Sequence, residues 1–206
     1  EMNVLQKNQA PSFAHWFGTD QFGRDIFSRV MEGASTSFFI AVCVVLVGAG
    51  IGTFAGSVTA YYGGVLDAVL MRINDVLAAF PSVLLAICFV AVIGPGTYNL
   101  IVALGIVFIP SFTRVVRSEV LVQKELDYVR NAKLMGAKDM RILVFHILPN
   151  IKPVLKTSLL VGFQNAVLSE AGMSYLGLGV PMPKAAWGSM INRANDDNIM
   201  ENYPNM

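Results

Sequence analysis

The sequence predicts an all-α polytopic membrane protein, and three observations favour this fold class. Hydrophobic residues make up 54% of the 206 residues and charged residues only 14%, whereas soluble proteins average about 25% charged residues. The mean hydropathy is +0.57. The apolar residues also form runs that approach the roughly 20 residues of a membrane-spanning helix. An unusually apolar soluble domain, the alternative, would not need such runs.

Four segments are expected to span the membrane, at residues 36–61, 76–97, 98–117 and 153–179. The first two are uncharged from residue 38 to 61 and from 76 to 97, although Pro81 interrupts the second. The third carries Arg114, and the fourth carries a lysine near one end and Glu170 inside. Together they form one transmembrane domain at residues 34–180.

The distribution of basic residues predicts the orientation of these segments. Arg72 and the stretch 114–156 hold ten of the 15 lysines and arginines, and basic residues accumulate on the cytoplasmic side. Residues 1–33 and 181–206 then become extracytoplasmic loops, the first with an amphipathic helix at Gly23–Glu32. Because residues 1–33 contain no apolar leader, we expect a further span upstream of this chain.

Glycines divide and pack the predicted spans. Gly48, Gly52 and Gly56 are spaced four apart, which lets two membrane helices approach closely. Gly63–Gly64 and the sequence Gly-Pro-Gly at 94–96 predict turns.

Polar groups and a proline within the spans are candidates for the transport pathway or its gate. Pro81 either kinks the second span around a cavity or simply starts a helix. Glu170 is the only acidic residue within a span, and Gln164 and Asn165 precede it. Ionisable residues in membranes are functional candidates, although Glu170 at the outer interface would only pair locally.

The longest basic stretch, residues 118–152 (the basic loop), predicts two helices joined by a glycine turn. Apolar positions continue a helix from the third span through Met135, and Gly136 suits a left-handed cap. Asp139 then fits the first turn of the next helix. The apolar side of that helix comprises Ile142, Leu143, Phe145 and Ile147, and Pro149 ends it.

A small apolar tip at the bend is expected to insert into a partner. It consists of Ala132, Met135, Gly136, Ala137 and Met140. Lys133, Lys138 and Arg141 surround it, so the partner's groove would have acidic edges. A loop that only fixes topology and touches anionic lipid is the alternative.

The basic loop resembles the cytoplasmic "EAA" loop of membrane subunits of binding-protein-dependent ABC importers. That pattern is Glu-Ala-Ala, three residues, Gly, nine residues, Ile-x-Leu-Pro. This sequence has RNA at 130–132, Gly136, and HILP at 146–149. Arg130 and His146 stand where the pattern has Glu and Ile.

Other stretches are similar to the second permease subunit of the dipeptide/oligopeptide/nickel family. They are HWFGTDQFGRDIFSRV, MRINDVLAAFPSVLLAI, YVRNAKLMGAKDMRI, SEAGMSYLGLGV and WGSMI. The resemblance covers residues 15–191. It implies the type I transmembrane-domain fold of ABC importers, with about four of six spans in this chain, in a bacterial or archaeal cell membrane.

The resemblance further implies a permease subunit that imports peptides or nickel. Its partners would be a second homologous permease subunit, two ABC ATPase subunits and an extracytoplasmic solute-binding protein, with no nucleic acid. The chain would bind no cofactor or metal, because ATP and Mg would bind the ATPase subunits. The expected coupling residues are Arg130, Asn131, Ala132, Lys133, Leu134, Met135, Gly136, Ala137, Lys138, Asp139, Met140, Leu148 and Pro149.

Two other classes of function remain open from the residues themselves. One is a stand-alone channel or ion-coupled transporter that the basic loop regulates. The other is a membrane enzyme with Ser174 as its nucleophile. The chain lacks the Gly-x-x-x-x-Gly-Lys-Ser/Thr loop that cradles nucleotide phosphates, so we do not expect it to be an ATPase.

Overall fold

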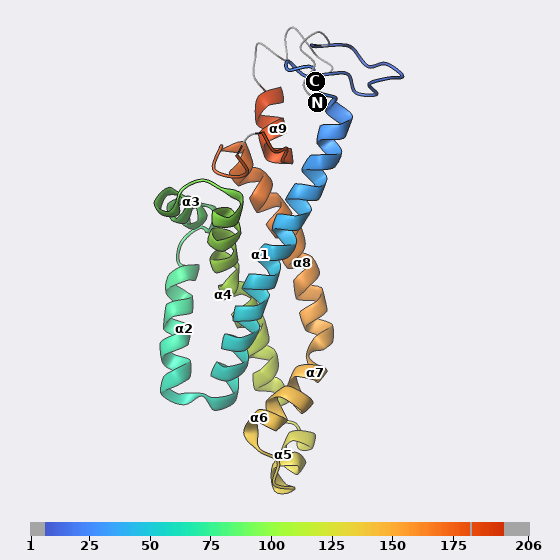
Figure 1. Cartoon of the computed structure of the whole chain (residues 1–206). Helices are drawn as coiled ribbons and strands as arrows, with labels where there is room; N and C mark the ends of the chain where they lie inside the picture. Colours follow the sequence, from blue (N-terminus) through green and yellow to red (C-terminus); the bar gives the residue numbers. More distant parts are fainter. Residues whose placement is uncertain (1–6, 182, 196–206) are drawn as a thin grey trace. The chain divides into compact units, whose positions relative to one another are not determined.

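The computed structural model describes residues 7–181 and 183–195, and every regular element in this part of the chain is a helix. The helices are α1 (Ile26–Tyr62), α2 (Gly64–Ala78), α3 (Ser82–Ile93), α4 (Thr97–Gln123), α5 (Asp127–Leu134), α6 (Asp139–Ile142), the π-helix η2 (Leu143–Ile147), α7 (Leu148–Asn150), α8 (Lys152–Tyr175) and α9 (Trp187–Ala194) (Figure 1). The predicted all-α class is confirmed.

The chain divides into two units. Unit 1 comprises residues Glu1–Ala41, Val90–Leu100 and Val167–Met206. Unit 2 comprises Val42–Phe89 and Ile101–Ala166.

The number of apolar spans differs from the four expected. Among the described residues, α1 and α4 are long and apolar enough to cross a membrane, and α2 with α3 adds a third if that bent pair is one span. The fourth expected span coincides largely with α8, which does not meet the same criterion. Its lysines, Gln164, Asn165 and Glu170 lower its hydropathy, and its assignment as a span stays a prediction.

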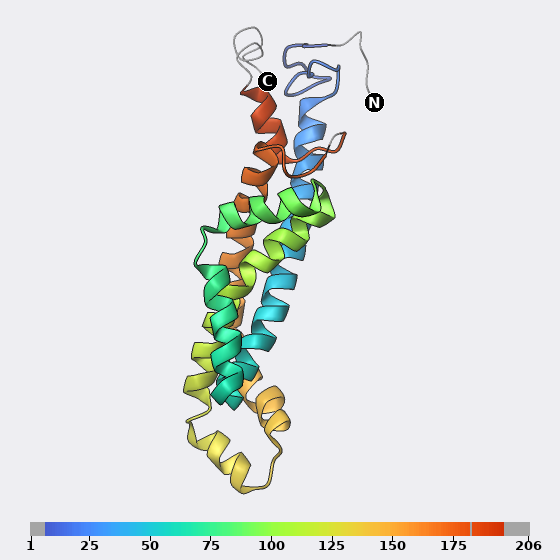
Figure 2. The same cartoon turned by 90° about the vertical axis from the view of Figure 1, so that its left-hand side faces the viewer.

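The span expected at 76–97, which Pro81 interrupts, contains the end of one helix and the whole of the next. α2 ends at Ala78 and α3 starts at Ser82, with a bend of 91° between them (Figure 2). Pro81 has no N–H to donate and its ring disfavours a helical conformation at the residue before it. Of the two alternatives left open for Pro81, the structure shows a helix start, because α3 begins at the next residue after the chain has turned by 91°.

In unit 2, glycines bring α1 and α4 into direct backbone contact. A Cβ added to Gly48 would lie 2.8 Å from the Cβ of Phe108, and one added to Gly52 would lie 2.6 Å from the Cβ of Phe112. At Gly56 it would lie 2.5 Å from the carbonyl oxygen of Thr113. The glycine face predicted from the four-residue spacing is thus confirmed, and α4 is the helix that packs on it.

Ion pairs join α2 to α4 within unit 2. Arg117 donates two hydrogen bonds to Asp67, at 2.8 and 2.7 Å, and Arg114 donates one to Asp75 at 3.0 Å. The predicted turn between α1 and α2 is confirmed, because Gly63 and Gly64 both have positive φ. The ion pair between Asp67 and Arg117 places the start of α2 beside the last turns of α4, where the basic loop begins.

In unit 1, the first turns of α1 pack against α9. The indole N–H of Trp187 donates to the carbonyl of Val30 at 3.1 Å, and its ring meets Phe38 edge-on. The expected separate helix at Gly23–Glu32 is not formed, since α1 starts at Ile26 and continues without a break. Trp187 packs closely against Gly33 of α1, where an added Cβ would lie 3.1 Å from the indole ring, and this contact supports the first turns of the long helix.

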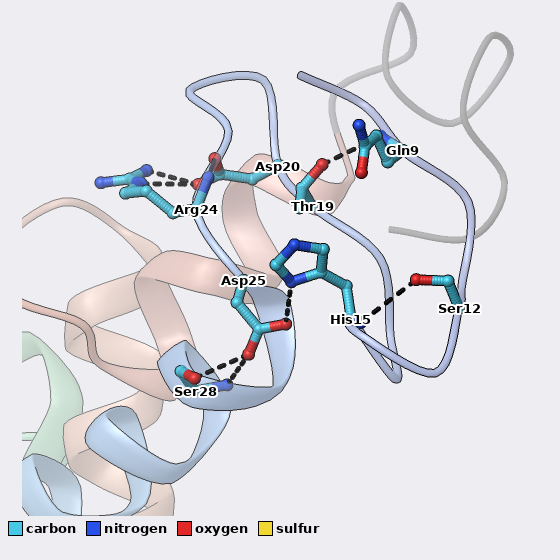
Figure 3. Close-up of polar contacts among 8 residues, drawn as sticks. All are labelled: Gln9, Ser12, His15, Thr19, Asp20, Arg24, Asp25 and Ser28. Atoms are coloured by element: carbon cyan, nitrogen blue, oxygen red, sulfur yellow. Dashed lines mark hydrogen bonds and ion pairs between the residues drawn. The ribbon is translucent and has the colours of Figure 1, made fainter. Parts of the chain in front are cut away.

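The segment before α1 (residues 7–25, the outer segment) is ordered by polar contacts (Figure 3). Asp25 caps α1 by accepting hydrogen bonds from the backbone N–H and the hydroxyl of Ser28 at 2.7 and 2.6 Å. Its other oxygen lies 3.0 Å from Nδ1 of His15. These contacts satisfy a free N–H at the start of the helix and fix the path of the outer segment.

Candidate functional site

The bend of the basic loop is a helix C-cap built on Gly136. Gly136 has a φ of +81°, and its N–H donates to the carbonyl of Lys133. The N–H of Ala137 donates to the carbonyl of Ala132 at 3.0 Å. This pair of bonds is the Schellman motif, so the predicted left-handed glycine is confirmed.

The helix that leads into the bend is broken, which was not expected. α4 ends at Gln123, and Leu126 has an extended backbone with φ −76° and ψ 151° before α5 begins. Lys124 at this break donates to the carbonyl of Ala60 at 2.9 Å. The side chain thereby satisfies a free carbonyl near the C-terminus of α1, which ties the loop to that helix.

After the bend, the chain is helical from Asp139 to Asn150, and Pro149 does not end it. Asp139 lies in the first turn of α6, as predicted, and accepts a hydrogen bond from the hydroxyl of Tyr61 at 2.6 Å. The N–H of Leu148 donates to the carbonyl of Leu143, five residues back. This wider π-turn accommodates a proline that has no N–H of its own.

An apolar cluster holds the basic loop against the ends of three long helices of unit 2. Its buried members come from α1 and α4, from the loop itself and from the residue before α8: Ala60, Val116, Val120, Val129, Ile142, Leu143, Ile147 and Ile151. Ala132, Ala137 and Leu148 pack around them. The basic loop is therefore packed against the ends of these helices.

The opposite face of the loop exposes large apolar side chains. Leu134 is 85% exposed, Met135 88% and Phe145 72%, and Met140 is also exposed. We call Leu134, Met135, Met140 and Phe145 the exposed tip. Phe145 was predicted on the buried side with Ile142, but the π-turn places it on the outside. Leu134 also belongs to this exposed surface, whereas Ala132 and Ala137 face the cluster.

The charges around the exposed tip are accessible. Lys133, Lys138 and Arg141 are exposed, and an open hollow is lined by Lys138, Arg141, Met140 and Phe145 with their neighbours. Arg130, which stands where the family pattern has Glu, makes only long contacts of 3.6 and 3.9 Å with Glu125 and Asp127. Such exposed pairs contribute little to stability.

Three of the candidate pathway residues belong to unit 2. Pro81 lies exposed between α2 and α3, and Gln164 and Asn165 lie exposed on α8 in unit 2. Asn165 borders a cavity of ≈ 220 Å³ between α4 and α8, together with Ser111, Thr157 and Ser158. These three hydroxyls were not among the predicted site residues, although small polar residues in spanning helices often mark helix interfaces.

Glu170 lies in unit 1 and is fully buried. Its Oε1 accepts a hydrogen bond from the hydroxyl of Ser174 at 2.6 Å, and its Oε2 has no partner within residues 7–181 and 183–195. Gly188 of α9 packs against the backbone of Ala171, one residue on. The interaction of Ser174 is thus with the carboxylate, and within the same described residues no group of three or more His, Cys, Asp or Glu is placed to hold a metal.

Comparison with known proteins identifies relatives over nearly the whole chain. Residues 48–199 match the family described as "Binding-protein-dependent transport system inner membrane component". The Glutathione transport system permease protein GsiD of Escherichia coli O157:H7 is 45% identical over 193 residues, which are 94% of this chain and 64% of that protein. The protein of the same name from Shigella sonnei (strain Ss046) gives the same values.

The similarity extends to a further genus. The GsiD protein of Pectobacterium atrosepticum is 44% identical over the same shares of both chains. The chain therefore spans 64% of the length of the curated relatives it matches.

Proposed function

Because this chain belongs to the family of binding-protein-dependent transport system inner membrane components, we propose that it is a permease subunit of an ATP-driven importer of peptide-like solutes. Family membership confirms the resemblance found in the sequence. The chain is a multi-pass inner-membrane protein with the type I transmembrane-domain fold of ABC importers. A peptide is favoured over nickel because glutathione, named for the relatives, is a tripeptide.

The exposed tip is the observation that carries the proposal. Four large apolar side chains that are each more than half exposed, near Lys133, Lys138 and Arg141, are unfavourable in water unless a partner covers them. An ATPase subunit with an apolar groove and acidic edges has the complementary chemistry. Two such subunits would bind ATP and Mg, and this chain would bind neither.

The packing of the basic loop supports its role as the coupling element. A force applied at the exposed tip reaches α1 through Tyr61 and Lys124, and reaches α4 through Val116 and Val120. Packed interiors transmit displacement because they have little free volume. Movement of the ATPase subunits would therefore tilt the spans as rigid bodies.

The largely apolar cavity between α4 and α8, which four polar side chains border, is the proposed wall of the translocation pathway. Ser111, Thr157, Ser158 and Asn165 would be poorly placed against lipid but well placed against water or a polar solute. A second, homologous permease subunit would complete the wall, and an extracytoplasmic binding protein would deliver the solute. Glu170 and Pro81 would act in gating rather than in contact with the solute.

Substitution of Gly136 tests the proposal in the assembled transporter. Gly136→Val places a β-branched residue at a φ of +81°, which is strongly disfavoured, although no atom lies within 4 Å of the added Cβ. We expect loss of ATPase copurification with normal membrane insertion. Gly136→Asn is the matched control, because asparagine tolerates the left-handed conformation, and it should retain the ATPase.

Two results would contradict the proposal. One is full ATPase binding by the Gly136→Val variant. The other is solute uptake that persists when the ATPase subunits are absent and that collapses with the ion gradient, as expected of an ion-coupled carrier.

A further inference from the structure

A pocket in unit 1 brings three arginines together around one carboxylate. The outer segment and the start of α1 contribute Asp20, Arg24 and Arg29, and α9 contributes Arg193. The pocket has a volume of ≈ 70 Å³. A single water needs about 10–15 Å³, so the pocket has room for a group as large as a carboxylate.

The carboxylate of Asp20 is already engaged by its neighbours (Figure 3). One oxygen accepts hydrogen bonds from the backbone N–H groups of Phe22 and Arg24, both at 2.9 Å. The other accepts a hydrogen bond from Nε of Arg24 at 2.7 Å and lies 2.6 Å from its Nη2. Asp20 therefore balances the charge of Arg24 and has little left to offer a second guanidinium.

The other two arginines are left with weak compensation. Nε of Arg29 lies 3.9 Å from Asp20, beyond hydrogen-bonding distance, although its side chain is only 10% exposed. Arg193 has no ion pair within residues 7–181 and 183–195. Glu32 is exposed and forms no ion pair with the arginines in that part of the chain, and Asp25 is engaged with His15 and Ser28.

The electrostatics of Arg193 agree with an excess of positive charge. Partial burial lowers the pKa of its guanidinium, and the charge of Arg24 lowers it further, against a smaller opposing effect of Asp20. Partial burial of a cation without a partner carries a cost, and an incoming anion would reduce that cost.

We propose that this pocket binds the carboxylate of a small organic acid, the group found at the free C-terminus of a peptide. The planar fork of arginine matches a carboxylate, and Ile26, Met190 and Ala194 provide an apolar wall for the aliphatic part of the ligand. That wall favours an organic acid over inorganic phosphate. The identification of this acid with the imported solute rests on the proposed function.

Calorimetry on the full-length permease–ATPase complex in nanodiscs, without a binding protein, tests the pocket. The probes are glutathione, its dimethyl ester and inorganic phosphate. The variant is Arg193→Gln. Because the side chain of Arg193 is partly exposed, its replacement should perturb the fold less than a replacement of the buried Arg29. Arg72→Gln is the control, since Arg72 is an exposed arginine of α2.

We expect glutathione to bind, and the ester to bind at least about tenfold more weakly, as for loss of a charge-assisted hydrogen bond. Arg193→Gln should weaken glutathione binding by a similar factor at an unchanged melting temperature, and Arg72→Gln should have no effect. Absence of glutathione binding, equal binding of acid and ester, tighter binding of phosphate, or wild-type affinity in Arg193→Gln would each overturn the proposal. Binding that persists in a Gly136→Val variant without ATPase would support the pocket independently of the proposed coupling.

Discussion

The basic loop of unit 2 and the outer segment of unit 1 use the same kind of charge in opposite ways. In the basic loop, Lys133, Lys138 and Arg141 are exposed, and Arg130 makes only long ion pairs. Before and at the start of α1, the side chains of Arg24 and Arg29 are 11% and 10% exposed and surround Asp20.

This difference separates charge that stabilises the chain from charge that is available to a partner. Exposed ion pairs contribute about 0–1 kcal/mol to folding, so the exposed Lys138 and Arg141 are available to interact with another protein. Buried charges are expensive when their partner is removed, so those of the outer segment fix the fold. Substitutions in the two regions should therefore have different consequences.

Removal of Asp20 should have the largest effect. Asp20→Asn leaves the buried guanidinium of Arg24 uncompensated and should lower the free energy of unfolding by about 3 kcal/mol. Asp127→Asn in the basic loop, whose carboxylate is 93% exposed, should change it by less than about 0.5 kcal/mol. Tryptophan fluorescence during denaturation follows unit 1, because both tryptophans, Trp16 and Trp187, belong to it. Equal destabilisation by the two variants would show that the buried charges do not stabilise the chain more than the exposed ones do.

Within the basic loop, substitutions on the buried face and on the exposed face should also differ in their effect on stability. Ile142→Ala opens a cavity in the apolar cluster and should cost about 2 kcal/mol, with amide exchange in residues 127–150 about 30-fold faster. Met140→Ala, on the exposed tip, should leave exchange unchanged. Hydrogen-exchange mass spectrometry in nanodiscs measures both variants. Rapid exchange in the wild type, matching Ile142→Ala, would show that the cluster does not hold the loop.

Acid should weaken the outer segment by a smaller amount. A hydrogen bond from the hydroxyl of Ser28 lowers the pKa of Asp25, and His15 lowers it further, against the effect of burial. Because the folded pKa is lowered, the stabilisation is complete above the unfolded pKa and is lost as pH falls through the folded one. Asp25→Ala should cost about 1 kcal/mol at neutral pH.

Melting temperatures measured between neutral and acidic pH test this linkage. The Asp25→Ala variant should have a flatter pH profile than the wild type. Some slope should remain, because the pKa of Asp20 is also lowered. An identical slope in both proteins would exclude Asp25 as a contributor.

Features that depend on local backbone chemistry were predictable from the sequence. Gly63, Gly64 and Gly136 have the positive φ that their turns require, and the spacing of Gly48 to Gly56 identified a packing face. In each case a short stretch of residues contains the whole physical cause.

Features that depend on distant residues were not predictable in this way. Phe145 was assigned to the wrong face because a regular helical period does not contain the π-turn. The arginine pocket requires Arg193 to lie beside Asp20 and Arg24, and no local pattern brings these residues together. The roles assigned to the coupling and pathway residues, and the orientation of the spans, stay predictions.

The π-turn at Leu143–Ile147 also sets a rotational phase. Each residue of an α-helix advances by about 100° around the axis, so a turn that holds one extra residue offsets everything before it by that angle relative to everything after. Deletion of one residue from this turn would rotate Met140 and Lys138 by about 100° around the helix axis relative to α8. An insertion or deletion in this turn should thus change the direction of the exposed tip even when none of the tip's own residues is changed.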